Sequence, residues 1–208
     1  MGWELDFLNW VNQTLHGWPV LNLIFRYITV LGDGGFAWFL LGIILACIKK
    51  TRRMGLTVVA GVLVLGSLNN YVIKILVARP RPFNVVGGEE LKIFVNATIT
   101  PLINVGNIHL FGMSTDSAFM SGHTVSSVAA ATIVYSFNKK IGIPVIVVAA
   151  LVALSRLFLV VHYPTDVIAG AIFAIAGALG IVWVSNLINK KIQAKKALKT
   201  SVTSTKIG

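Results

Sequence analysis

Long apolar runs constrain this chain more than any other feature of its sequence. A helix needs roughly 20 apolar residues to cross a bilayer, and four runs approach that length while a fifth is shorter. The five runs are Gly55–Val77, Thr124–Phe137, Ile141–Val161, Val167–Ile188 and, the short one, Phe36–Ile48. Only 12% of the 208 residues are charged, against about 25% in soluble domains. The sequence therefore predicts an all-α protein that crosses a membrane several times.

The N-terminal part leaves the number of spans open between six and five. Trp3–Gln13 mixes apolar and polar residues in a pattern that predicts an amphipathic helix at the membrane surface, within residues 1–18. Pro19–Leu31 fits either a sixth, irregular span or a continuation of that helix. The N-terminus lacks a basic region, so no cleaved signal peptide is expected. The expected fold is one domain, residues 1–208, a bundle of six or five transmembrane helices plus the interfacial helix.

Basic residues predict how the bundle is oriented. They gather in three segments without any acidic residue: Lys49, Lys50, Arg52 and Arg53; Lys139 and Lys140; and Lys190, Lys191, Lys195, Lys196, Lys199 and Lys206. The positive-inside rule places all three in the cytoplasm, which accounts for the net charge of +11 without nucleic acid as a partner. Residues 78–120 then form an external loop. Residues 189–208 form a basic cytoplasmic tail, expected to be disordered after Leu198.

A first cluster of polar residues lies at the external end of the run that finishes at Val77. Lys74 and Arg81 are seven residues apart, so they share a face for as long as the helix continues. Two cations on one face suit a phosphate, because arginine offers a planar fork of donors and lysine a point charge. The alternative is a charged helix end that snorkels to the interface, although the positive-inside rule disfavours cations on this side.

A second cluster, Ser121-Gly122-His123, precedes the run that ends at Phe137. Ser121 is a typical helix N-cap, and the free N–H groups at a helix start bind anions. Gly122 lets an anion approach the backbone closely, and His123 is placed to deliver a proton to it. Taken alone, the cluster is better explained as an ordinary cap followed by an interfacial histidine.

A third cluster contains Arg156, His162 and Asp166. Arg156 lies inside an apolar run, where a cation costs about 2.5–3.5 kcal/mol on insertion scales and marks a candidate functional site. Pro164 suits the first turn of the next helix, which brings Asp166 opposite His162. A carboxylate on one imidazole nitrogen makes the other nitrogen a better base or nucleophile. A merely polar corner is the alternative, but the three clusters together predict a phosphate site on the external face.

In order and spacing, the three clusters resemble the motifs of the type 2 phosphatidic acid phosphatase family. The family pattern Lys-x6-Arg-Pro matches Lys74–Pro82, and Ser-Arg-x5-His-x3-Asp matches Ser155–Asp166 without departure. The family pattern Pro-Ser-Gly-His reads Met-Ser-Gly-His over residues 120–123, so Met120 replaces the proline. This change concerns the path of the chain into the helix more than the chemistry.

The resemblance implies a six-helix membrane fold and catalysis without a metal or another cofactor. It implies that His162 attacks phosphorus to form a phosphohistidine, that Asp166 orients His162, and that His123 protonates the departing oxygen. The residues that would hold the phosphoryl oxygens are Lys74, Arg81, Ser121, Gly122 and Arg156. Asp33, which lies between glycines, is interpreted as a turn residue near the site rather than a catalyst.

The motifs address the phosphate and leave the lipid open. Bacterial members of this size favour phosphatidylglycerophosphate first, with phosphatidylglycerol as the product, then undecaprenyl pyrophosphate, then phosphatidic acid. The expected partners are thus a lipid phosphate and the surrounding membrane lipids. An anion transporter is the alternative from another class, and a silent scaffold a third. Neither needs a nucleophile, an orienting carboxylate and a proton donor. The sequence makes no prediction about the oligomeric state.

Overall fold

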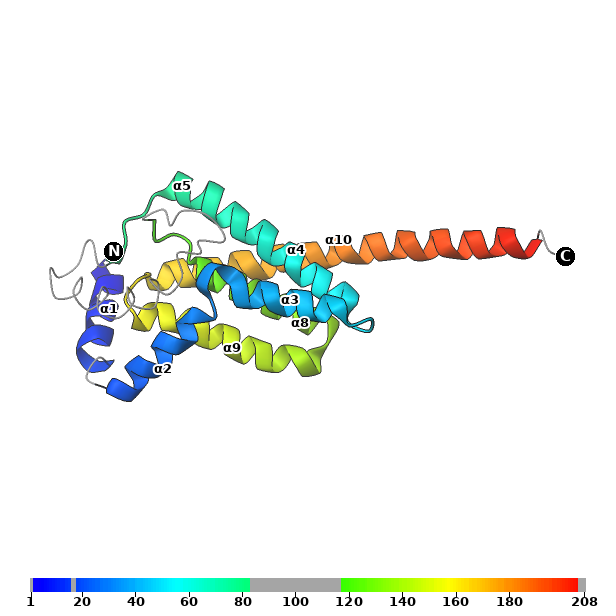
Figure 1. Ribbon diagram of the computed structural model, residues 1–208. Helices are drawn as coiled ribbons and strands as arrows, with labels where there is room; N and C mark the ends of the chain where they lie inside the picture. Colours follow the sequence, from blue (N-terminus) through cyan, green and yellow to red (C-terminus); the bar gives the residue numbers. More distant parts are fainter. Residues whose placement is uncertain (1, 16–17, 83–116, 206–208) are drawn as a thin grey trace.

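A computed structural model describes residues 2–15, 18–82 and 117–205 of the chain, which are helical almost throughout (Figure 1). Four segments are long and apolar enough to cross a membrane: Leu23–Cys47, Arg52–Val77, Lys139–Phe158 and Pro164–Thr200. A helix satisfies its backbone groups internally, which is what the hydrocarbon region demands. The chain is therefore the all-α, multi-pass membrane protein that its apolar runs predict.

The described residues form eight α-helices. They are α1 (Gly2–Leu15), α2 (Pro19–Val30), α3 (Phe36–Cys47), α4 (Arg52–Leu68), α5 (Lys74–Val77), α8 (Gly122–Phe137), α9 (Lys139–Phe158) and α10 (Pro164–Thr205). A 3-10 turn, Asp33–Gly35, joins α2 to α3, and a π-helical turn, Asn69–Ile73, joins α4 to α5. The greater part of the expected external loop, residues 83–116, lies outside the described residues.

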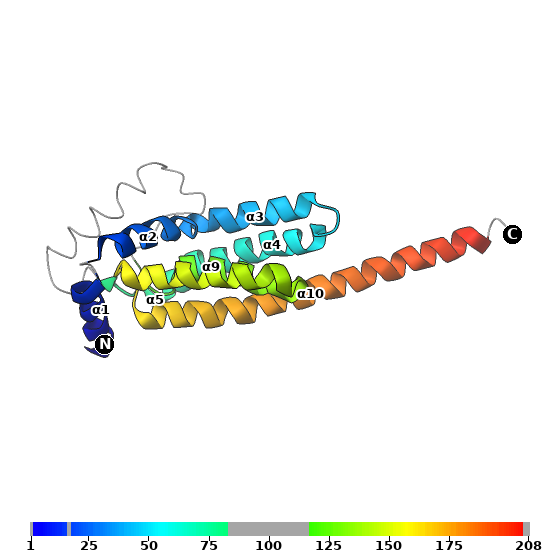
Figure 2. The same cartoon turned by 90° about the horizontal axis from the view of Figure 1, so that it is seen from below.

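Helices α2 and α3 follow one another along one side of the bundle (Figure 2) and meet at a bend (Figure 1). The turn between them depends on Gly34 and Gly35, whose φ angles of 56° and 72° are costly for residues with a Cβ. Pro19–Leu31 therefore leads into the same crossing as α3 instead of making a separate sixth one. Counting the sheltered α8 with the four candidate spans gives five in the described part of the chain, consistent with the expected six or five.

Helix α8 is the central helix of the bundle, packed against α4, α9 and α10. It has only 16 residues, fewer than a lipid-exposed span needs, but its neighbours bury much of its surface. Val125, Ala129, Ile133 and Val134 are all fully buried on it. Because α8 is sheltered by other helices, its short length is compatible with a place inside the membrane.

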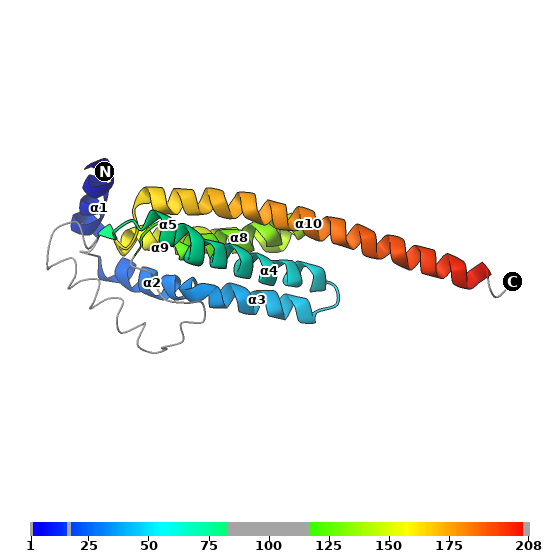
Figure 3. The ribbon, with the colours of Figure 1, turned by 90° about the horizontal axis from the view of Figure 1, so that it is seen from above.

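The three basic segments of the sequence lie toward one end of the bundle (Figures 1 and 3). Arg53, at the start of α4, donates hydrogen bonds to Ser185 and Asn186 of α10, which fixes the α3–α4 loop beside the last helix. From there α10 continues as helix to Thr205. The expectation of disorder after Leu198 is thus wrong for the described residues, because no glycine or proline interrupts α10 after Gly180.

Helix α1 lies across the opposite end of the bundle (Figures 2 and 3). It is amphipathic as predicted, with Trp3 and Trp10 exposed and Leu8 buried. The buried face, however, turns toward the protein, since Leu8 packs with Val160 and Tyr163 at the junction of α9 and α10. This contact brings the N-terminal helix next to the third motif.

Candidate active site

His162 lies in the tight turn that connects α9 to α10, and only 2% of its surface is exposed. Its Nδ1 is 2.7 Å from the carbonyl oxygen of Ala118 and 3.7 Å from Oδ2 of Asp166. A carbonyl oxygen can only accept, so Nδ1 carries the hydrogen and Nε2 keeps its lone pair. The nearest partner of Nδ1 is therefore a backbone carbonyl, and Asp166 stands beyond hydrogen-bond distance.

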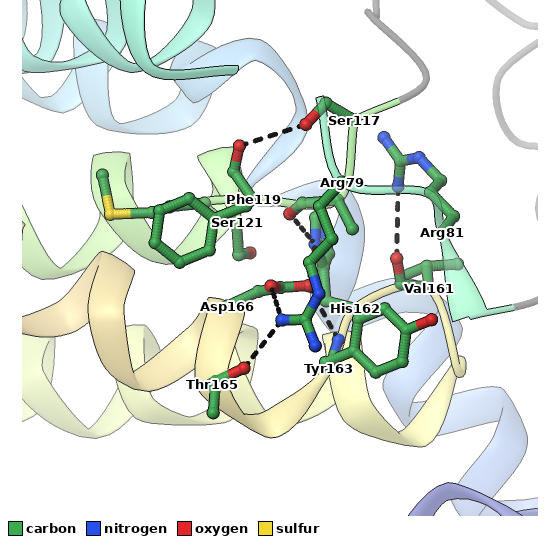
Figure 4. Close-up of polar contacts among 12 residues, drawn as sticks. Arg79, Arg81, Ser117, Phe119, Ser121, Val161, His162, Tyr163, Thr165 and Asp166 are labelled. Carbon is green, nitrogen blue, oxygen red and sulfur yellow. Dashed lines mark hydrogen bonds and ion pairs between the residues drawn. The ribbon is translucent and has the colours of Figure 1, made fainter. Parts of the chain in front are cut away.

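Asp166, in the first turn of α10, is fully buried, and its carboxylate accepts hydrogen bonds from groups other than His162. Its Oδ2 accepts a 2.9 Å hydrogen bond from the Tyr163 N–H, and its Oδ1 accepts a 2.6 Å bond from Arg79 (Figure 4). The backbone bond follows from the helix start, where N–H groups are free for a side-chain acceptor. The carboxylate is thus held rigidly beside the His162 ring.

Arg79 is a residue of the site that the motif reading missed. Its guanidinium contacts Asp166 and Thr165 of α10 and Glu4 of α1, and it lies 3.9 Å over the ring of Tyr163. Burial lowers the pKa of Arg79, but the charges of Asp166 and Glu4 outweigh burial and raise it. The available signal was a cation directly after the apolar run that ends at Val77, the same signal that indicated Arg81.

Glu4 completes this cluster from the N-terminal helix. It is 4% exposed and accepts hydrogen bonds from the backbone N–H of Thr165 at 3.2 Å and from its hydroxyl at 2.6 Å. Burial raises the pKa of Glu4, but the bonds from Thr165 and Arg79 outweigh burial and lower it. Glu4 lies on the buried face of α1, where a charged side chain needs a partner.

The second motif starts α8, and Ser121 is its N-cap as predicted. Its Oγ accepts from the Thr124 N–H at 3.4 Å and from the Thr124 hydroxyl at 3.0 Å. Its own N–H donates to the Asp166 carbonyl oxygen at 3.3 Å, which ties the second motif to the third. A Cβ added to Gly122 would stand 3.9 Å from Nζ of Lys74, so the first motif reaches the same place.

The three predicted cations come to the site from different elements. Helix α5 ends at Val77 and Ala78 turns the chain with a φ of 44°. Lys74 therefore reaches the site from the helix, whereas Arg81 does so from the segment after it and donates to the Val161 carbonyl at 3.3 Å. The expected shared helical face does not extend as far as Arg81.

Arg156 approaches from α9 and is 6% exposed. One of its terminal nitrogens donates to the hydroxyl of Thr29, while its Nε has no hydrogen-bond partner among the described residues. A buried donor without a partner is rare, and here it fits an incoming anion. Burial, followed by the charges of Arg81, Arg156 and Lys74, lowers the pKa of His162 well below its usual 6.5, so the ring is neutral at pH 7.

His123 lies in the first turn of α8 and contacts the turn between α2 and α3. Its Nε2 is 2.8 Å from Oδ1 of Asp33, and a Cβ added to Gly32 would be only 2.5 Å from its Cδ2. Asp33 is thus in the turn, as its neighbouring glycines indicate, but it also bonds a predicted catalytic side chain. Within the described residues no three His, Cys, Asp or Glu side chains gather to hold a metal.

The part of the chain that carries these residues matches a known protein family. Residues 52–190 match the model of the PAP2 superfamily, and that stretch contains all three motifs. The chain belongs to the PAP2 superfamily. The family expected from its motifs is the correct one. Glu4 and Asp33 lie outside the matched residues, which is why the motifs could not indicate their contacts.

Curated relatives of this PAP2 protein include two undecaprenyl-diphosphatases. The one from Sulfolobus acidocaldarius is 34% identical over 139 residues, which cover 65% of this chain and 57% of the relative. The one named BcrC, from Bacillus subtilis, is 29% identical over 164 residues, which cover 77% and 72%. A Bacillus licheniformis protein named bacitracin transport permease protein BcrC is 32% identical over 90 residues, 43% and 44% of the two chains.

Two solved structures share the fold. LpxE of Aquifex aeolicus superposes with a TM-score of 0.60 at 23% identity, covering 86% of this chain and 93% of that one. A PAP2-type phosphatidylglycerolphosphate phosphatase of Bacillus subtilis superposes with a TM-score of 0.62 at 24% identity, covering 92% and 86%. At this identity the likeness is one of fold, and it agrees with the all-helical membrane architecture.

Proposed function

We propose that this PAP2 protein is an undecaprenyl-diphosphate phosphatase that works through a phosphohistidine on His162. The observation that carries the mechanism is the setting of that ring: Nδ1 is engaged by the Ala118 carbonyl, which leaves Nε2 unprotonated. Burial and the nearby positive charges keep the ring neutral, and those charges attract a phosphate. A neutral imidazole facing a group of cations is what nucleophilic attack on a phosphate requires.

In the first step, the lone pair of His162 Nε2 forms a bond to phosphorus while the bond from phosphorus to the leaving oxygen breaks. The leaving oxygen takes that electron pair and receives a proton from His123. Phosphoryl transfer depends mainly on positioning and on charge around the equatorial oxygens. Lys74, Arg81 and Arg156 supply that charge, with the Gly122 N–H and Ser121 at the helix start.

In the second step, water attacks phosphorus and gives a proton to His123, and the bond from phosphorus to Nε2 breaks. The electron pair returns to His162, and inorganic phosphate leaves. Asp166 stands 3.7 Å from Nδ1, where its charge stabilises the ring while the phosphohistidine carries positive charge. Ala118 supplies the direct hydrogen bond.

The substrate assignment is supported by the curated relatives, two of which are named undecaprenyl-diphosphatases. Phosphatidylglycerophosphate, the first choice from the sequence, stays the second candidate, because the three motifs address the phosphoryl group and not the lipid. Transport of an anionic solute is the outcome to consider if no phosphate is released. It would leave the arrangement of His162, Asp166 and His123 without a role.

The site is proposed to face the outside of the cell. It lies near the end of the bundle where α9 meets α10, while the three basic segments lie toward the other end (Figure 1). The positive-inside rule assigns the basic end, and with it the C-terminus, to the cytoplasm. A cysteine-labelling assay on intact cells, with reporters placed near Arg81 and near Lys195, tests this orientation.

The test is phosphate release by the purified protein in detergent, with undecaprenyl diphosphate and phosphatidylglycerophosphate assayed in parallel. EDTA in both assays tests the expected independence from metal ions. We expect EDTA-resistant release that His162→Ala abolishes, and an acid-labile, base-stable phosphoprotein when labelled substrate is quenched early. Ser136→Ala, an exposed hydroxyl on α8, is the control. Release that persists in His162→Ala would contradict the mechanism, and the ratio of rates decides the substrate.

A further inference from the structure

The turn between α2 and α3 is built around the side chain of His123. Asp33 Oδ1 lies 2.8 Å from Nε2 of the ring, and Gly32 lets the backbone approach Cδ2 more closely than any residue with a Cβ would. Gly35 continues the turn with a left-handed φ of 72° and packs near Ser126, one turn along α8. Asp33 and Gly32 thus hold the His123 ring from a segment about 90 residues away in the sequence, and Gly35 packs that segment against the same helix.

The Asp33 contact determines how the His123 ring is protonated. An ionised carboxylate only accepts hydrogen bonds, so Nε2 carries a hydrogen. Among the described residues, Nδ1 of His123 has no hydrogen-bond partner. It is therefore the nitrogen available to the substrate. The arrangement is the same as in a histidine–carboxylate pair of a hydrolase, with the two nitrogens exchanged.

The surrounding charges explain why such a partner is needed. The charged groups that act on His123 are Arg156 of α9, Lys74 of α5 and Asp33. The two cations oppose a second proton on the ring, and Asp33 is the negative charge in contact with it. A general acid must hold a proton before it can give one away.

We propose that Asp33 is a positioning residue for the general acid, fixing the His123 ring through Nε2 and keeping a proton available on Nδ1 for the departing oxygen. This inference rests on the proposed phosphatase function. Asp33 itself touches neither the phosphate nor His162 in this scheme, and it acts through His123. The side chain of Asp33 is 47% exposed, so the pair contributes little to folding stability and its role is visible in the kinetics.

The leaving group provides the test, because only some substrates need an acid. Undecaprenyl diphosphate releases a phosphate oxygen, which needs a proton less than an alkoxide does, so the second candidate substrate is used here. The leaving oxygen of phosphatidylglycerophosphate is that of an alcohol and must be protonated, whereas p-nitrophenolate departs without a proton. Asp33→Asn keeps the shape of the side chain and removes its charge. We expect kcat on phosphatidylglycerophosphate to fall about 10- to 100-fold, kcat on p-nitrophenyl phosphate to stay within about twofold, and KM to change little for both.

The pH profile is the second measurement. Without the carboxylate, His123 loses its proton at lower pH. The alkaline limb of kcat on phosphatidylglycerophosphate should therefore move to lower pH in Asp33→Asn. Asp6→Asn, which removes an exposed carboxylate of α1, is the matched control and should leave both the rates and the profile unchanged.

Two results would overturn the proposal. Equal losses on the two substrates would assign Asp33 a structural role, and unchanged rates on both would make it a bystander. The ratio of the two rates is taken within one preparation, so it does not depend on how much of the variant folds. Failure of the phosphatase assignment has a different signature, since wild type would then release no phosphate or His162→Ala would still release it.

Discussion

Replacing Arg79 with methionine should cost about 3–5 kcal/mol of unfolding free energy, the usual cost of leaving a buried charge without its partner. The Arg79 side chain is 14% exposed, and its two acidic partners are nearly or fully buried, Glu4 at 5% and Asp166 at 0%. Methionine keeps the contact with the Tyr163 ring but removes both ion pairs. Two carboxylates then lie close together in a poorly solvated place with no cation between them.

Removing Glu4 instead should cost less. Glu4→Gln leaves the pair of Arg79 and Asp166 intact, and the amide oxygen still accepts from Thr165, so about 1.5 kcal/mol is expected. In the Arg79→Met background the same change removes one of two unpaired negative charges. The double variant should therefore be less destabilised than the sum of the single variants, by about 1–3 kcal/mol.

Unfolding is followed by the fluorescence of the five tryptophans while SDS is titrated into detergent micelles. Arg52→Met is the control, because Arg52 is exposed and, within the part of the chain that the structure describes, bonds only the Ala46 carbonyl, at 3.2 Å. It should cost about 0.5 kcal/mol or less. The reasoning is refuted if Arg79→Met costs no more than the control, or if the Glu4 and Arg79 changes are strictly additive.

Two further predictions concern the phosphate site. Because burial and the neighbouring cations lower the pKa of His162, the nucleophile stays neutral as the pH falls past 6.5. The acid limb of kcat/KM should lie below that value, and a His162-dependent limb at or above 6.5 would count against it. Gly122→Ala places a Cβ 3.6 Å from Oδ1 of Asn70 and 3.9 Å from Nζ of Lys74, so the fold has room but the phosphate loses space. We expect kcat/KM to fall about 10- to 100-fold, or 1.4–2.8 kcal/mol, with unchanged unfolding by the SDS titration; a loss of stability instead would show that the added methyl group disturbs packing.

Local patterns carried most of what the sequence could determine by itself. The need for about 20 apolar residues per crossing located the spans Arg52–Val77 and Lys139–Phe158, the second of which ends before the expected Val161. The cap preference of serine identified Ser121 as the start of a helix. Motif spacing indicated the PAP2 family, because Lys74, His162 and their neighbours are spaced along the chain as they are in the family motifs. Each of these signals depends on residues close together in sequence.

Only the tertiary structure decided which groups meet. Glu4 bonds Arg79 across 75 residues and Thr165 across 161, and Asp33 bonds His123 across 90. Neither the hydrophobic period of a helix nor a motif encodes such pairings. They depend on how α1 docks on the end of the bundle and on the bend between α2 and α3.

Because the sequence does not encode long-range pairings, some contacts in the site differ from those expected. The sequence paired Asp166 with His162, whereas packing brings Ala118 closer to that ring and Arg79 to that carboxylate. A sequence states which side chains can hydrogen-bond, and burial then requires each to find some partner. Which partner it finds follows from the three-dimensional path of the backbone. The chemistry of the site was therefore predictable from the residues, whereas the hydrogen-bond partners within it were not.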